Sequence, residues 1–112
     1  MSRVAVVILN YNGKELLEKF LPSVTAFSDD AQIVVADNNS TDGSKDFLQQ
    51  AYPQVILIPI SSNLGFCGGY NFALQQIQAE YYVLLNSDVE VSSNWLEPII
   101  SLLDNDPSIA VA

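Results

Sequence analysis

The stretch VVADNNSTDGS, residues 34–44, passes directly from an apolar run to a cluster of polar, turn-forming residues. A continuous apolar run that stops at a carboxylate is typical of a strand buried on both faces of a parallel sheet. Asp37 and the asparagines after it then stand where the chain turns toward a helix. Such residues serve ordinary turns, so this stretch alone is compatible with either a plain loop or one wall of a binding site.

Apolar runs and helical patterns alternate along the rest of the chain. Continuous runs predict strands at 4–9, 33–36, 55–60, 81–85 and 109–112, and apolar residues at helical spacing predict helices within 16–27, 47–51, 66–77 and 94–103. This alternation predicts a three-layer α/β/α fold, with a mostly parallel sheet and helices on both of its faces.

Several single residues refine these expected elements. Pro22 is expected to kink or loosen the first helix, and Pro59 to mark an edge strand or a strand end. Ser40 or Thr41 is the expected N-cap of the second helix. The last helix is expected to begin with a capping box formed by Asn94 and Glu97.

Charge and composition exclude several classes of function. The net charge is −9, and the four basic residues are scattered rather than gathered in a stripe, which disfavours nucleic acid and anionic membrane surfaces as partners. The chain has no histidine, and its one cysteine, Cys67, cannot form an internal disulfide, in keeping with a cytoplasmic setting. No apolar run approaches the ~18 residues of a transmembrane helix. A phosphorylated ligand would need a cation to accompany it.

Polar segments follow each of the first four expected strands. Because ligands in parallel sheets bind beyond the carboxyl ends of the strands, these segments are expected to meet at one rim and form a site. None carries the G-x-x-x-x-G-K-[ST] phosphate loop or the G-x-G-x-x-G dinucleotide motif. The four segments are LNYNG (9–13), DNNSTDG (37–43), SSNLGFCGGYN (61–71) and NSDVE (86–90).

Asp88 and Glu90 are the carboxylates best placed to hold a metal. Mg²⁺ in proteins typically takes one or two carboxylates together with substrate phosphates and water. Two acids that flank a valine are also compatible with a solvated turn, so both interpretations stay open at this point. Catalysis by Cys67 is disfavoured because no histidine is present to activate the thiol.

Four segments together resemble the amino-terminal half of family 2 glycosyltransferases with the GT-A fold. They are VVILNYNG, VVADNNSTDGS, NLGFCGGYNFAL and YYVLLNSDVEV, and their order and spacing match the family across nearly all 112 residues. The LNSDVEV variant resembles the branch that contains rhamnosyltransferases of bacterial cell-surface polysaccharides. Residues 1–112 are thus expected to be the part that binds a nucleotide-diphosphate sugar, incomplete at the carboxyl terminus.

The resemblance implies a role for each segment. The backbone of residues 9–12 and the carboxylate of Asp37 would contact the base of a UDP or dTDP sugar. The family's D-x-D motif, which bridges ribose, metal and diphosphate, falls on residues 86–88 with an amide in place of its first acid. Asp88, with Glu90 as a further candidate, would hold Mg²⁺ or Mn²⁺. The nucleotide-contacting residues implied in this way are Leu9, Asn10, Tyr11, Asn12, Asp37, Asn39, Asn63, Gly68, Asn71, Asn86 and Ser87.

The implied reaction is metal-dependent, inverting transfer of a sugar to a saccharide or lipid-linked acceptor in cell-surface polysaccharide synthesis. The general base is expected beyond Ala112, so residues 1–112 are expected to bind the donor without transferring sugar, and to self-associate through an open sheet edge. The full enzyme is expected in the cytoplasm, at the inner face of the membrane. Two alternatives stay open: a nucleotidyltransferase-like nucleotide-sugar enzyme and a non-catalytic interaction module.

Overall fold

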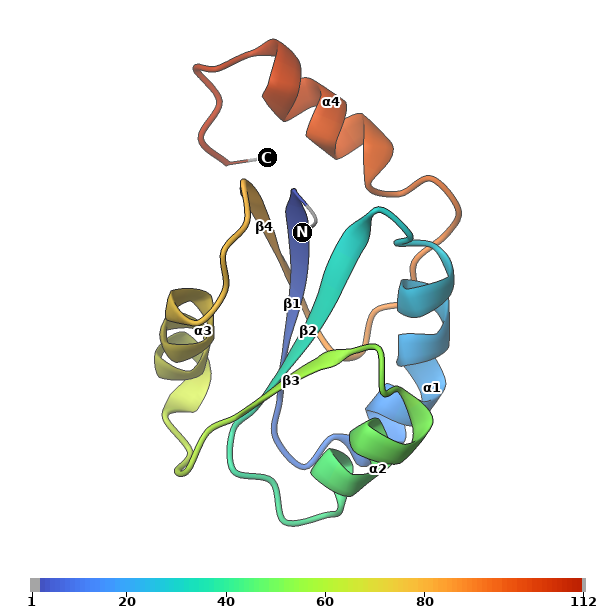
Figure 1. Cartoon of the computed structure of the whole chain (residues 1–112), viewed down its shortest axis with the longest axis vertical. Coiled ribbons are helices and arrows are strands. Elements are labelled where there is room, and N and C mark those ends of the chain that lie inside the picture. Colours follow the sequence, from blue (N-terminus) through green and yellow to red (C-terminus); the bar gives the residue numbers. More distant parts are fainter. Residues whose placement is uncertain (1–2, 112) are drawn as a thin grey trace.

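A computed structural model describes residues 3–111 and shows a four-stranded sheet with helices around it (Figure 1). The sheet has the order β3-β2-β1-β4, and each pair of neighbouring strands is parallel. The parallel sheet predicted from the alternating pattern is therefore confirmed. In chain order the elements are β1 (Val4–Asn10), α1 (Lys14–Ala26), β2 (Ala31–Asp37), α2 (Ser44–Ala51), β3 (Ile56–Pro59), α3 (Gly65–Gln75), β4 (Tyr81–Leu85) and α4 (Glu97–Asn105).

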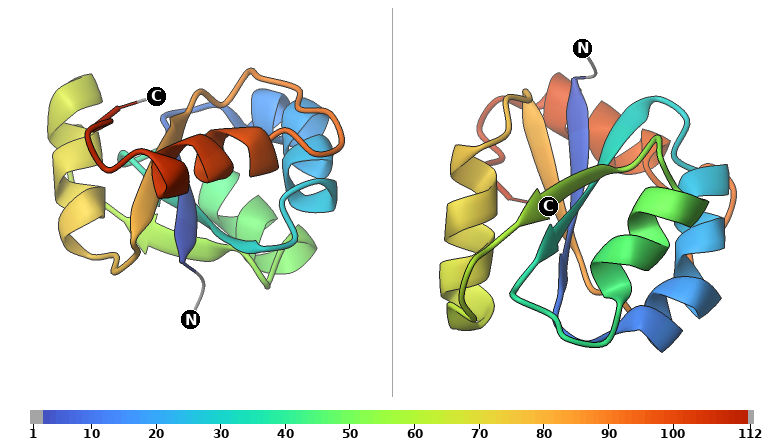
Figure 2. Two further views of the ribbon diagram at one scale, coloured as in Figure 1. Left: turned by 90° about the horizontal axis from the view of Figure 1, so that it is seen from above. Right: turned by 60° about the horizontal axis from the view of Figure 1, so that its bottom comes forward.

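The two faces of the sheet bury different residues. Because side chains alternate along a strand, Val6 and Ile8 of β1 pack with Leu17 and Leu21 of α1, on the face that α2 also covers. Ala5 and Val7 of β1, together with Val34 and Ala36 of β2, pack on the opposite face with Tyr70 and Ala73 of α3. Figures 1 and 2 show these helices on either side of the sheet, which confirms the three-layer prediction. Burying each such aliphatic side chain stabilises the fold by about 1.5–3 kcal/mol.

The register of the strands brings their carboxyl ends together. Asn10 pairs with Asp37, Asp37 pairs with Pro59, and Ile8 pairs with Leu85. The chain adds β2 and β3 on one side of β1 and then crosses to place β4 on the other side, so the strand order reverses between β1 and β4. Beyond such a reversal the connecting loops diverge and leave a crevice.

Pro59 and Pro22 differ in how far they limit their elements. Pro59 is the last residue of β3, and β3 is an edge strand, so the expectation for this proline is confirmed. Pro22 does not end α1, which continues to Ala26. In this last turn the Thr25 hydroxyl lies 3.1 Å from both the Leu21 and the Pro22 carbonyl oxygens and can donate a hydrogen bond to either of them.

Both predicted N-caps are wrong. α2 begins at Ser44, after Gly43 in the left-handed conformation (φ +86°), and the hydroxyl of Ser40 is used instead by the Asn12 N–H at 2.8 Å. α4 begins at Glu97, and Leu96 occupies its N-cap position. Asn94, at φ +61°, belongs to the loop before this helix.

The expected fifth strand is also wrong for the residues that the structure describes. Asp106 forms a turn in which its carbonyl accepts from the Ile109 N–H (3.1 Å) and its Oδ1 accepts from the Ser108 N–H (3.1 Å). Residues 109–111 follow this turn without joining the sheet, and Ala112 lies outside the described residues.

α4 lies beyond the amino ends of the strands, away from the rim where the loops converge (Figure 1). Arg3 connects α4 to the amino end of the sheet. Its guanidinium forms ion pairs with Asp104 of α4 (2.6 Å) and with Glu80, the residue before β4 (2.7 Å). The hydrogen bonds that Arg3 donates to the Glu80 and Asp104 carboxylates raise the pKa of the exposed guanidinium above its ordinary value. Within residues 3–111 no helix is both long and apolar enough to cross a bilayer.

Candidate functional site

A hollow of about 490 Å³ opens at the carboxyl end of the sheet, where the strand order reverses between β1 and β4. Its walls come from the ends of β1 and β4, the first residue after β2, and the start of α3. All four polar segments expected at this rim contribute to the lining. Three of them contribute residues at or just beyond the end of a strand, and the segment 61–71 contributes both a loop residue and the start of α3. The lining residues are Leu9, Tyr11, Leu16, Asn38, Asn63, Gly65, Phe66, Tyr70, Asn86, Ser87 and Asp88.

Aromatic residues form the α3 side of this hollow. Tyr11 is 52% exposed and Phe66 is 65% exposed, so both present ring surface to solvent. Phe66 packs edge-on against Tyr70, with ring centroids 5.0 Å apart. Burial raises the pKa of the Tyr70 phenol, which stays protonated and donates to the Leu85 carbonyl (3.2 Å). The rings offer flat apolar surface of the kind on which planar or sugar rings stack.

Asn38 connects this wall to β2. Its Nδ2 donates to Asn63 Oδ1 and to the Gly65 carbonyl, each at 3.1 Å, and its Oδ1 accepts from the Leu64 N–H at 2.9 Å. Gly65 has φ +77°, a conformation that other residues rarely adopt, and this allows the turn into α3. The loop before α3 is therefore pinned to the end of β2.

Asp37 lies on the opposite side of β2, facing α1 and α2, and is fully buried. Its Oδ1 accepts from Asn10 Nδ2 (2.9 Å), and its Oδ2 accepts from the Ser40 N–H (2.9 Å). Among the described residues, Asn10 Oδ1 has no hydrogen-bond partner, and a Cβ on Gly13 would come within 2.6 Å of it. Asp37 therefore already has an internal role, because it fixes the first turn after β2 to the end of β1.

Asn12 and Asp42 tie the outer parts of the first two loops together. Asn12 Oδ1 accepts from the Thr41 N–H (2.7 Å). Asp42 accepts from the Lys14 N–H and from the Ser44 N–H, each at 3.0 Å. These contacts make the loops after β1 and β2 one connected unit.

Asp88 is the one carboxylate among the residues that line the hollow, and the lining contains no lysine or arginine. Residues 3–111 hold no cluster of three or more Cys, Asp or Glu side chains that would bind a metal unaided. The oxygens of Asn86, Ser87 and Asp88 nevertheless fit a hard divalent cation that completes its shell with diphosphate and water, which is the usual mode of Mg²⁺. Glu90 is exposed and lies outside the lining.

The predicted residues fall into two groups. Those that line the hollow are Leu9, Tyr11, Asn63, Asn86, Ser87 and Asp88. Those that lie outside the lining are Asn10, Asn12, Asp37, Asn39, Gly68, Asn71 and Glu90. The role of each in binding stays a prediction for both groups. The lining also contains residues that the sequence reasoning did not select, namely Leu16, Asn38, Gly65, Phe66 and Tyr70.

A signal for Asn38 was present in the sequence. Val35 packs on the α1 side of the sheet and Ala36 on the α3 side. Because side chains alternate, residue 37 returns to the α1 side and residue 38 faces α3. Counting this alternation forward would have selected Asn38, rather than Asp37, for the side on which the hollow opens.

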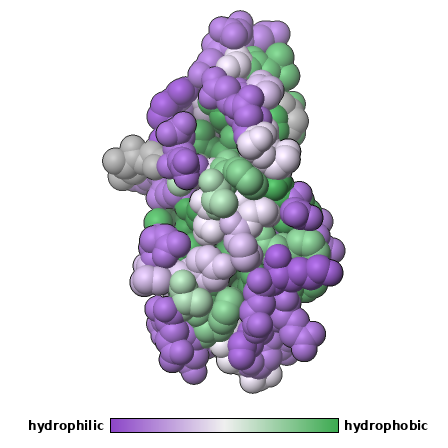
Figure 3. All heavy atoms as spheres, turned by 90° about the vertical axis from the view of Figure 1, so that its right-hand side faces the viewer, coloured by the Kyte–Doolittle hydropathy of each residue, from purple (hydrophilic) through white to green (hydrophobic). Residues whose placement is uncertain are grey.

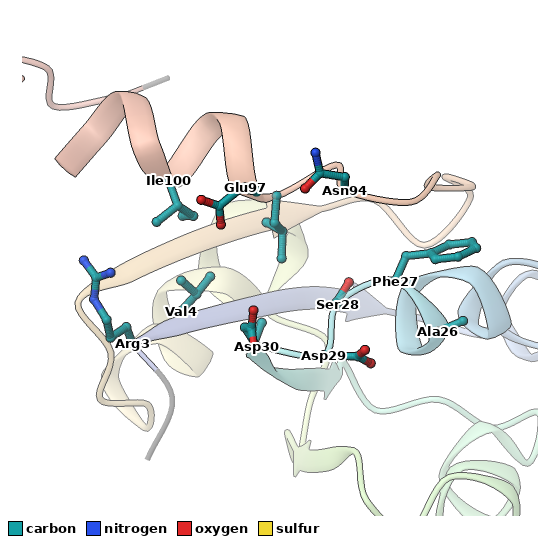
Figure 4. A pocket seen from close by; sticks show the side chains of 12 residues that line it. Arg3, Val4, Ala26, Phe27, Ser28, Asp29, Asp30, Asn94, Glu97 and Ile100 are labelled. Atoms are coloured by element: carbon teal, nitrogen blue, oxygen red, sulfur yellow. The ribbon is translucent and has the colours of Figure 1, made fainter. Parts of the chain in front are cut away.

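A second hollow of about 500 Å³ lies at the amino ends of the strands (Figure 4). It is bounded by β1, the turn before β2 and the start of α4, and it combines Phe27, Ile100 and other apolar residues with Asp29, Asp30 and Glu97. Figure 3 shows apolar surface between the part of the molecule that contains α4 and the rest. This hollow lies at the opposite end of the strands from the predicted rim.

A parallel α/β sheet with a polar hollow at its switch point defines the class of nucleotide-binding, Rossmann-like proteins. Within that class, the chain belongs to glycosyl transferase family 2, whose family model matches residues 5–112. The fold is that of GT-A glycosyltransferases. In a superposition covering 96% of this chain and 33% of the other, it matches the mannosyltransferase PcManGT from Pyrobaculum calidifontis, solved in complex with GDP-Man and Mn²⁺, with a TM-score of 0.82 and 25% identity.

Two of the curated relatives are glycosyltransferases whose names state what they act on. The chain is 36% identical over 73 residues to an N-acetylglucosaminyl-diphospho-decaprenol L-rhamnosyltransferase of Mycobacterium tuberculosis, covering 64% of this chain and 24% of that protein. It is 32% identical over 101 residues to a poly(ribitol-phosphate) beta-glucosyltransferase of Bacillus spizizenii, covering 84% of this chain and 16% of that protein. The chain thus spans a quarter or less of the length of these two relatives.

Proposed function

We propose that residues 1–112 form the nucleotide-sugar-binding part of a glycosyltransferase that acts in cell-surface polysaccharide synthesis. The observation that carries the proposal is the hollow at the switch point, where Asn63, Asn86, Ser87 and Asp88 from separate loops meet beside an aromatic wall. The family assignment supports transfer from an activated sugar, and the names of the relatives support a saccharide or lipid-linked acceptor.

We propose UDP or dTDP as the nucleotide of the donor. The exposed rings of Tyr11 and Phe66 offer stacking surface for the base or sugar, and the amides of Asn63 and Asn86 offer hydrogen bonds to ribose hydroxyls. Asn10, Asn12 and Asp37 hold together the loops after β1 and β2 that border this space, and Asn39 stays a candidate for a direct contact. Gly68 and Asn71 stay candidates for contacts from α3.

A divalent cation, Mg²⁺ or Mn²⁺, is part of the proposal. The lining offers one carboxylate and no cationic side chain, so the charge of a diphosphate must be met from elsewhere. When bound, such an ion would stabilise the charge that develops on the leaving nucleotide diphosphate. Asp88 would hold it, while Asn86 would hydrogen-bond the ribose. Inversion at the anomeric carbon is proposed for the whole enzyme.

The test is calorimetric titration of the chain with UDP, dTDP and GDP, with and without Mn²⁺. We expect UDP or dTDP to bind at least 10-fold more tightly with the metal, and Asp88→Asn to remove that gain while the free energy of unfolding stays unchanged. Asp88 lies in a loop, and the substitution keeps its shape while removing its charge.

Two control variants sharpen this test. Asp29→Asn makes the same chemical change in the turn before β2, at the other end of the sheet, and is expected to leave binding unchanged. Glu90→Gln decides whether the second predicted carboxylate contributes, and its place outside the lining predicts an effect of less than 2-fold. Equal nucleotide affinity in Asp88→Asn and in the wild type would overturn the metal assignment. No affinity for any of the three nucleotides would favour the interaction-module alternative.

A further inference from the structure

We propose that Asn38 is a positioning residue whose buried carboxamide holds residues 63–65 in place as a wall of the nucleotide site. This inference rests on the proposed function, because it assigns what sets the affinity of that same site. Asn38 is 2% exposed, and its main-chain N–H donates to the Asn10 carbonyl at 2.8 Å, so its own backbone is fixed by β1.

The three hydrogen bonds of the Asn38 side chain all go to one loop. Two donated bonds, to Asn63 Oδ1 and the Gly65 carbonyl, and one accepted bond, from the Leu64 N–H, lie between 2.9 and 3.1 Å. Asn63 Oδ1 also accepts from the Gly65 N–H at 2.8 Å. The loop is therefore held by three bonds from a residue that is itself immobilised.

Neither aspartate nor a longer side chain meets these demands. Aspartate has the same shape but no donor, and its charge would face two oxygen atoms, Asn63 Oδ1 and the Gly65 carbonyl. A longer side chain would not fit, because Gly69 of α3 packs so closely that a Cβ there would lie 3.1 Å from Asn38 Nδ2 and 2.6 Å from Leu9 Cδ1. Both size and polarity thus specify asparagine.

The link to function lies in the position of the loop. Asn63, Gly65 and Phe66 line the hollow, and Asn86, Ser87 and Asp88 enter it from the end of β4. When only part of the molecules have the loop ordered, the apparent affinity for the nucleotide is the intrinsic affinity multiplied by that ordered fraction. Loss of the Asn38 bonds is therefore expected to weaken nucleotide binding by 10-fold or more, without disturbing the sheet.

The experiment combines UDP binding with amide hydrogen exchange. In Asn38→Asp at pH 7, we expect UDP affinity in the presence of Mn²⁺ to fall at least 10-fold. The Leu64 amide should lose its protection, whereas Val34 and Val35 in the core of β2 should keep theirs. Asn105→Asp, the same change at the exposed end of α4, is the matched control and is expected to alter neither readout.

A pH series distinguishes positioning from general damage. A protonated carboxyl regains one donor and keeps one acceptor, so protection of the Leu64 amide in Asn38→Asp should return as the pH falls toward about 4, the usual range for an aspartate. Asn38→Ala should lose the same protection and affinity at pH 7 but show no recovery. Because Asn38→Ala adds no buried charge, it also serves if the aspartate variant does not fold.

Each outcome bears on a separate claim. Wild-type binding with unchanged affinity in both Asn38 variants would overturn the inference and leave the proposed function standing. Weaker binding with an unchanged Leu64 amide would overturn it as well, because Asn38 would not act through the loop. Absence of UDP binding by the wild type would overturn the proposed function, and the inference with it.

Discussion

Asp42 holds the starts of two helices at once. Its Oδ2 accepts from the Lys14 N–H at the start of α1, and its Oδ1 accepts from the Ser44 N–H at the start of α2 and also from the Ser44 hydroxyl. Partial burial raises the pKa of this carboxyl, but the hydrogen bonds from Ser44 and Lys14 outweigh burial, so its pKa lies below the ordinary value. One side chain thus does the work that separate caps do in other folds.

This lowered pKa predicts how stability responds to acid. The contribution of Asp42 is complete above the pKa of an unfolded aspartate, about 4, and is lost as the pH falls through the lower folded value. Asp42→Asn should lower the free energy of unfolding at pH 7 by about 1 kcal/mol, the size of a lost helix cap. The loss should be no larger, because Asp42 is exposed and solvent screens its charge. Urea unfolding from pH 7 to pH 3 measures this, and the gap between variant and wild type should narrow at the acid end.

Asp46→Asn is the matched control for the Asp42 prediction. Asp46 carries the same charge in the first turn of α2 but does not accept the Lys14 and Ser44 bonds. It should therefore cost less at pH 7 and change less with pH. Equal effects of the two substitutions would show that charge near the helix start, rather than the two-helix contact, accounts for the stability.

The two edge strands differ in how they are protected. β3 has four residues and ends in Pro59, which cannot donate a ladder hydrogen bond. β4, with the sequence YYVLL, has neither a proline nor a charge, and Tyr82 and Leu84 are 42% and 53% exposed. Both face the α3 side of the sheet, since they pair with Ala5 and Val7. β4 thus combines an open ladder with apolar surface.

Such an edge predicts self-association of the chain. Leu84→Lys places a charge on the open strand, one of the devices by which natural edges avoid pairing, and should shift the chain toward monomer. Sedimentation velocity over a concentration series measures this. Leu102→Lys, at a residue of α4 that is 51% exposed, is the control and should associate like the wild type. Equal association of the wild type and Leu84→Lys would show that β4 is not the contact.

The elements were predictable from the sequence to different degrees. Continuous apolar runs mark β1 and β2, which are buried on both faces, and β4, which is partly exposed on one face, so all three were predicted close to their observed bounds. The start of α2 was missed because Ser40 bonds to Asn12 in the loop after β1 and Asp42 bonds to Lys14 at the start of α1, contacts that local capping rules do not contain. The same limit applies to the site: residues 63–65 are bound to the end of β2 by Asn38, and its contact with Asn63 spans 25 residues of sequence.

At the scale of the whole molecule, the order of the elements predicted that polar loops would gather at one rim, and Asn63 and Asp88 do line one hollow there. Which side of the rim would open could not be predicted from the order alone. The strand order places the reversal between β1 and β4, and the face of the sheet that α3 covers decides which side chain at the end of β2 reaches the hollow. The hollow consequently opens beside Asn38, while Asp37 stays in the interior.

The net charge of −9 acts on the whole molecule and leads to the last prediction. At about 0.01 M salt the screening length is roughly 30 Å, longer than the 27 and 23 Å short dimensions of the protein, so its carboxylates repel one another across the entire fold. At about 0.1 M salt that length falls to about 10 Å and the repulsion becomes local. The ion pairs of the exposed Arg3 weaken as well, but solvent already screens such exposed pairs, so their loss has little effect on stability. The free energy of unfolding in urea, measured with a chelator present, should therefore rise with sodium chloride, and Arg3→Gln, which makes the net charge more negative, should steepen the rise. A fall with added salt would mean that attraction between specific pairs outweighs the overall repulsion.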